Sequence, residues 1–150
     1  MAGDSALLRV LELRENEEKQ AMERWSAAVN SVHSYEQQIA QIERFSAVYA
    51  QEMAERTAPG MGMGVFMSYQ NFLDKLAQIT LRQQKALEDL RVQEQRLKEE
   101  YLERQKARKI IESLLEKHRL ERLKAEAVAE RKLSDDIVSS KQARMMMRRS

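Results

Sequence analysis

The 150-residue chain contains no cysteine, one proline, four glycines and only 5% aromatic residues. Without cysteine, disulfides and thiolate chemistry are excluded, which fits a reducing compartment. No apolar run approaches the roughly 20 residues that span a bilayer. The first residues lack a cationic region followed by an apolar block, so no signal peptide is expected. We therefore expect a soluble, cytoplasmic protein.

The residues that are abundant are those of long helices. Charged residues make up 33% of the chain and hydrophobic residues 43%, and the mean hydropathy is −0.66. Much Ala, Leu, Glu, Lys, Arg and Gln with few helix breakers is typical of coiled coils. Such a chain buries a narrow seam and not a thick core.

The formal net charge of +2 hides an asymmetry along the chain. Residues 1–60 carry 6 basic and 10 acidic groups, whereas residues 61–150 carry 20 and 14. The last ten residues, KQARMMMRRS, contain four basic groups and no acid. A basic stretch of this kind can contact an acidic partner, anionic lipid or nucleic acid, or it can simply be a solvated end.

Apolar residues in the first part of the chain recur with alternating steps of four and three. This rhythm is the seam of a supercoiled helix and predicts a first helix over about residues 5–56. Asp4 or Ser5 is the expected N-cap. The seam positions, three of them not apolar, are Leu7, Leu11, Arg14, Glu18, Ala21, Trp25, Ala28, Val32, Tyr35, Ile39, Ile42, Ser46, Tyr49 and Met53.

A similar seam predicts a second, longer helix over about residues 66–140, with Ser68 as a candidate cap and a basic tail at 141–150. Glu100 and Arg104 form an expected i,i+4 pair along it. Its seam positions are Phe66, Tyr69, Leu73, Leu76, Leu87, Leu90, Leu97 and Tyr101. Beyond them the phase drifts, as expected where a helix loses its partner. The drift runs through Ile111, Leu114, Leu115, Leu120 and Leu123.

The breakers gather between the two seams, in TAPGMGMGV at residues 57–65. Pro59 cannot extend a helix, and the three glycines that follow accept positive φ, so the chain reverses here. The sequence thus predicts an all-α fold with two long helices in a single antiparallel coiled-coil hairpin, the second arm longer.

No pattern of catalytic or metal-binding residues emerges. GMGMG lacks the Gly-Lys pair of a phosphate-binding loop. His33 and His118 have no partner at metal-ligand spacing and are expected on helix surfaces. The adjacent carboxylates Glu99–Glu100 and Asp135–Asp136 point apart on a helix. We therefore expect a protein that is not an enzyme and that holds no cofactor or metal.

Next to the turn, the hairpin places two short stripes at the same height. If the turn centres on Gly60 and Met61, residues equidistant from it lie level, so Tyr49 faces Phe72. Phe45 falls off the first seam, and Phe72 is next to the seam position Leu73. These rings either widen the seam or form an exposed surface for a partner. The two stripes together consist of Gln38, Ile42, Phe45, Tyr49, Phe72, Leu76, Ile79 and Gln83.

The stretch YQNFLDKL (69–76), directly after the Gly-rich turn, resembles the start of the second helix in the flagellar export protein FliJ family. KLSDDIVSSKQAR (132–144) is similar to the ending of that family, although Asp135–Asp136 depart from its usual Asp-Glu. The chain length, the absent cysteine and the acidic first helix agree with the resemblance, which covers essentially the whole chain.

The resemblance implies a cytoplasmic, stalk-like coiled coil at the flagellar type III export apparatus, peripheral to the inner membrane. It implies two partners, the hexameric export ATPase and the membrane export gate, together with a link to substrate chaperones and so to flagellum assembly, motility and chemotaxis. The eight residues of the two stripes correspond to the family's gate-binding surface, which favours the partner reading.

Three alternatives remain open on the sequence. A YscO-like coupling protein of a virulence secretion system shares the architecture. A generic coiled-coil scaffold or homodimer buries both stripes between chains. A basic nucleic-acid or membrane binder is the third alternative, but acids interspersed along the second arm and the lack of base-stacking aromatics speak against it.

Overall fold

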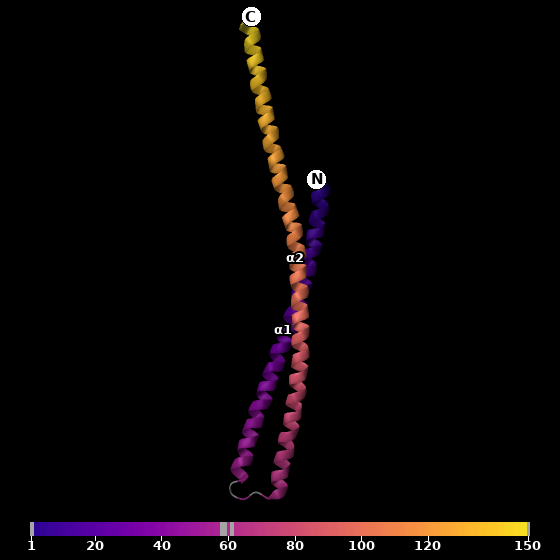
Figure 1. Ribbon diagram of the computed structural model, residues 1–150, viewed down its shortest axis with the longest axis vertical. Helices are drawn as coiled ribbons and strands as arrows, with labels where there is room; N and C mark the ends of the chain where they lie inside the picture. The colour runs from indigo at the N-terminus through magenta and orange to yellow at the C-terminus, as the bar shows by residue number, and fades with distance from the viewer. Residues whose placement is uncertain (1, 58–59, 61, 150) are drawn as a thin grey trace. The chain divides into compact units, whose positions relative to one another are not determined.

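The computed structural model describes residues 2–57, 60 and 62–149. These residues form two helices, α1 (Ala2–Thr57) and α2 (Met63–Arg149), without a strand among them. The helices pack against each other as an antiparallel hairpin whose second helix is longer (Figure 1). The all-α fold class predicted from the sequence is therefore confirmed.

Both helices extend further than their sequence patterns indicate. Because α1 begins at Ala2, Asp4 lies within its first turn and is not an N-cap. Residues 141–149, expected as a tail after the second helix, continue α2. This stretch has no glycine or proline, and its last turn carries Arg148 and Arg149, whose charge stabilises the carbonyl end of a helix.

The connection between the helices depends on one glycine in a left-handed conformation. Gly60 has a φ of 93°, and its N–H donates to the carbonyl of Thr57 at 3.1 Å. A side chain strains this conformation, which explains the glycine. Pro59, the predicted helix breaker, lies outside the described residues.

α2 starts at Met63, so Ser68 is not its cap and instead donates to the carbonyl of Gly64 at 3.0 Å.

The chain divides into two packed units. The seam unit consists of residues 17–104, and the terminal unit consists of residues 2–16 with 105–149. In the seam unit, the buried residues Val32, Ile39 and Leu87 form a cluster against which Tyr35 and Leu90 pack. Every predicted seam position between 18 and 101 is buried or half-buried, so the 4-3 pattern identified the packed face correctly.

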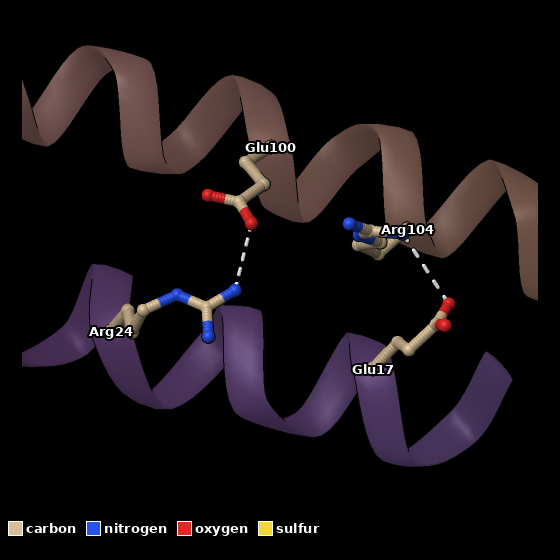
Figure 2. A network of polar contacts seen from close by, with 4 residues as sticks. All are labelled: Glu17, Arg24, Glu100 and Arg104. Carbon is tan, nitrogen blue, oxygen red and sulfur yellow. Dashed lines mark hydrogen bonds and ion pairs between the residues drawn. The ribbon is translucent and has the colours of Figure 1, made fainter. Parts of the chain in front are cut away.

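Ion pairs across the seam accompany this apolar contact. Arg24 of α1 bonds to Glu100 of α2 at 2.7 Å, and Arg104 of α2 bonds to Glu17 of α1 at 3.4 Å (Figure 2). The sequence predicted Glu100 and Arg104 as a pair along one helix, but the structure directs both to the other helix. Each such exposed pair stabilises by about 0.2–1 kcal/mol and helps to set the register.

In the terminal unit, the first turn of α1 is attached to α2 through Asp4. The carboxylate of Asp4 accepts from Nδ1 of His118 at 3.2 Å and also from Arg122. Nearby, Leu7 and Leu11 of α1 and Ile111 and Leu115 of α2 are half-buried. Contact between the helices in this unit therefore combines a short seam with one polar cluster.

The apolar contact ends within the region where the sequence pattern drifts. Leu114, Leu120 and Leu123 are exposed, and so is every residue of α2 from 123 to 149. The drift predicted beyond Tyr101 therefore includes residues that still pack, such as Ile111 and Leu115, and only its end, from residue 123 on, marks the part of α2 that leaves the seam.

Candidate functional site

The two stripes predicted beside the turn lie in the seam unit, on neighbouring helices. α1 supplies Gln38, Ile42, Phe45 and Tyr49, and α2 supplies Phe72, Leu76, Ile79 and Gln83. Steps of three and four residues keep each set on one side of its helix. We call these eight residues the patch.

Aromatic rings join the two halves of the patch. The centroids of Tyr49 and Phe72 are 4.6 Å apart, and Phe45 meets the Phe72 ring edge-on at 6.2 Å. Phe45 also stacks on Tyr49 at 6.1 Å. Such pairs contribute about 0.5–1.5 kcal/mol each beyond the area that they bury. The sequence correctly placed Tyr49 level with Phe72.

The exposure of the patch residues increases from the seam towards solvent. Ile42, Tyr49, Leu76 and Gln83 are half-buried. Phe45 is 53% exposed, Ile79 40% and Phe72 37%, and Gln38 is exposed as well. The sequence left open whether these rings widen the seam or form an exposed surface. Both occur, because Tyr49 belongs to the seam while Phe45 and Phe72 present apolar surface to water.

Two residues of this region were not among the predicted eight. Tyr69 is 8% exposed and lies 4.8 Å from the Tyr49 ring, with the Arg56 guanidinium 5.9 Å from its own centroid. Val48 is 57% exposed. It follows Phe45 by three residues, a spacing that places it on the same side of α1 and could have identified it.

The patch also contains a buried polar atom. Oε1 of Gln83 is inaccessible to water and accepts no hydrogen bond among the described residues. A buried carbonyl oxygen without a donor costs about 1–3 kcal/mol. This position is therefore not optimised for the stability of the hairpin.

The motif YQNFLDKL serves the seam and the patch together. Tyr69 is buried and Leu73 half-buried in the seam, whereas Phe72 faces outward from the same turn of α2. Gln70 donates to Asp74 at 3.3 Å along the exposed side. The motif thus packs the hairpin through one side and exposes an aromatic ring on another.

The remaining candidates lie elsewhere. His33 is exposed on α1, and His118 bonds to Asp4. Over residues 2–57, 60 and 62–149, no three His, Cys, Asp or Glu side chains gather as metal ligands do. Within those same ranges, neither helix contains a stretch apolar enough to cross a bilayer.

Comparison with protein families matches residues 4–146 to the model of the flagellar FliJ protein. The chain belongs to the FliJ family. This membership confirms the resemblance found in YQNFLDKL, and it makes the protein a component of the flagellar export apparatus. Neither a curated protein nor a solved structure matches the chain significantly.

Proposed function

We propose that this FliJ-family protein couples the hexameric export ATPase to the membrane export gate during flagellum assembly, without catalysing a reaction itself. One observation supports it above the others: Phe45 and Phe72 expose aromatic surface although both are in contact with the seam residue Tyr49. Exposed contiguous aromatic residues are typical of partner sites.

The two partners require two separate surfaces. The patch, in the seam unit, is the proposed docking surface for the export gate. Residues 2–16 of α1 and 105–122 of α2, in the terminal unit, are the proposed contact for the ATPase ring. In this proposal the protein acts in the cytoplasm, reaches the inner membrane only through the export apparatus, assists substrate chaperones and binds no nucleic acid.

The test compares two double variants with the intact protein. Phe45→Ala/Phe72→Ala removes the exposed rings of the patch. Leu81→Ala/Val92→Ala removes exposed apolar side chains from the opposite side of α2, because these positions lie about half a turn away from Phe72 around the helix axis. Leu81 and Val92 are 66% and 53% exposed, so the loss of apolar surface is comparable.

Binding is measured against the purified cytoplasmic part of the export gate and, separately, against the export ATPase. We expect the patch variant to bind the export gate at least about tenfold more weakly and to bind the ATPase as the intact protein does. Cells that carry this variant should form smaller motility haloes in soft agar. The control variant should behave as the intact protein. Gate binding that survives the loss of both rings disproves the assignment of the patch, and circular dichroism verifies that both variants stay helical.

A further inference from the structure

The part of α2 beyond the seam carries a second coiled-coil pattern. Residues 123–149 are helical and exposed throughout. Along this segment, steps of three and four run through Leu123, Glu126, Glu130, Leu133, Ile137, Ser140 and Arg144. Leu133 is 62% exposed and Ile137 51%. Apolar residues at 3-4 spacing are the pattern by which one helix packs on another, and three of the seven positions here are apolar.

The charges on this stripe are ordered along the helix. On the stripe, Glu126 and Glu130 precede the apolar pair and Arg144 follows it, while Lys141 lies beside the stripe next to Ser140. The stripe therefore has an acidic end, an apolar middle and a basic end. The last part of the helix, residues 137–149, contains four basic residues and no acid.

This order is self-complementary about Asp135. Leu133 and Ile137 lie at equal distances along the sequence from Asp135. The same holds for Glu126 and Arg144, and for Glu130 and Ser140, which is next to Lys141. Two antiparallel copies that cross at Asp135 thus place Leu133 against Ile137 and Glu126 against Arg144, each contact occurring twice. A parallel pair instead opposes Glu126 to Glu126 and Arg144 to Arg144, which repel.

We propose that residues 123–149 of α2 form a docking surface for the same segment of a second copy, in an antiparallel two-helix coiled coil. Asp135 itself lies about half a turn from Ile137 around the helix axis, so its charge stays in solvent in this arrangement. The apolar middle is short and is flanked by four polar layers, so the dimer is weak, with a Kd on the order of 100 µM. The inference goes beyond the proposed function and uses none of the patch residues.

Sedimentation equilibrium of the full chain up to about 1 mM tests the self-association. Ile137→Asp should leave a monomer at every concentration. Val128→Asp is the matched control, since Val128 is 67% exposed and lies on the opposite side of the helix from Ile137. A chain that stays monomeric throughout, or a dimer that Ile137→Asp leaves intact, overturns the proposal.

Charge reversal tests the pairing. Glu126→Arg alone and Arg144→Glu alone each replace two attractive contacts by two repulsive ones, and should raise the Kd about tenfold. The double variant Glu126→Arg/Arg144→Glu restores both contacts and should return the Kd to within about threefold of the original. Failure of the double variant to recover disproves the antiparallel pairing while leaving the helix itself untouched.

Spin labels test the direction of the helices. The chain has no cysteine, so Lys124→Cys gives one labelling site per copy. In the antiparallel dimer the two labels lie about 22 residues apart along the axis, or about 33 Å at 1.5 Å per residue. A parallel pair brings them to about 10 Å, the width of neighbouring helices. A short distance in the dimer contradicts the proposal.

Discussion

The ring of Phe45 meets the edge of the Phe72 ring at 6.2 Å, yet both rings stay exposed. The neighbouring seam residue Tyr69, in contrast, is 8% exposed. The two phenylalanines therefore leave aromatic surface in solvent beside the seam while their ring contacts still contribute to the packing of the hairpin.

Substitutions of a buried and of an exposed ring should differ in their effect on the stability of the hairpin. Tyr69→Ala removes a buried ring and should lower the free energy of unfolding by about 3 kcal/mol. Phe45→Ala removes an exposed ring that pairs with Tyr49 and Phe72, and should cost about 1–2 kcal/mol. Urea unfolding followed by circular dichroism measures both. Equal losses for the two variants would show that Phe45 belongs to the packed seam.

The turn offers a test of backbone strain. Gly60→Ala adds a side chain to a residue with a φ of 93°, and should destabilise the hairpin by about 1–2 kcal/mol. Among the described residues, no atom lies within 4 Å of a Cβ added at Gly60, so the expected cost is conformational and does not come from steric crowding. The midpoint of urea unfolding provides the measurement.

Gly64→Ala is the matched control for the turn. Gly64 lies inside α2 and its added Cβ also meets open space. Alanine in a helix is about 1 kcal/mol more favourable than glycine, so this variant should be more stable than the original. A loss of stability from both changes would argue against a left-handed Gly60.

The sequence predicted the packed face of the hairpin far better than its polar contacts. A 3.5-residue repeat is a property of a single helix, so the seam from Leu7 to Tyr101 could be deduced without the partner. Ion pairs depend on the register between helices, so the cross-seam partner of Glu100 could not be deduced from α2 alone. Exposure of Phe45 was equally undetermined, because it depends on how closely the two helices approach.

The end of α2 was underestimated for a different reason. The predicted tail at 141–150 was placed on composition, since basic stretches are often solvated ends. The absence of breakers and the basic residues at the last turn both favour helix continuation to Arg149.

Gln83 should be replaceable with a gain in stability. Gln83→Leu removes the buried oxygen that accepts no hydrogen bond and keeps apolar volume in the seam, so unfolding should require about 1 kcal/mol more. Gln38→Leu is the control, because Gln38 is exposed and its removal should change stability little. Urea titration compares the two. A less stable Gln83→Leu would mean that the amide forms a contact worth keeping.

Asp4 should make the attachment of the first turn of α1 depend on pH. The hydrogen bond from His118, aided by the charge of Arg122, lowers the pKa of Asp4 below its ordinary value of 3.8. A carboxyl with a lowered pKa stabilises the folded state above the unfolded pKa, and this stabilisation is lost as the pH falls below 3.8 through the folded pKa. Amide hydrogen exchange in residues 2–16 should therefore become less protected in this acid range, after correction for the intrinsic exchange rate.

Two variants show whether this loss comes from Asp4. Asp4→Asn removes the titrating group, so residues 2–16 should be weakly protected at neutral pH and should change little in acid. Glu116 also has a lowered pKa, because Arg119 hydrogen-bonds to it within α2. Since that pair does not involve α1, Glu116→Gln should leave the acid response of residues 2–16 in place. An acid response that persists in Asp4→Asn would assign the effect to another carboxylate and remove Asp4 as the attachment point.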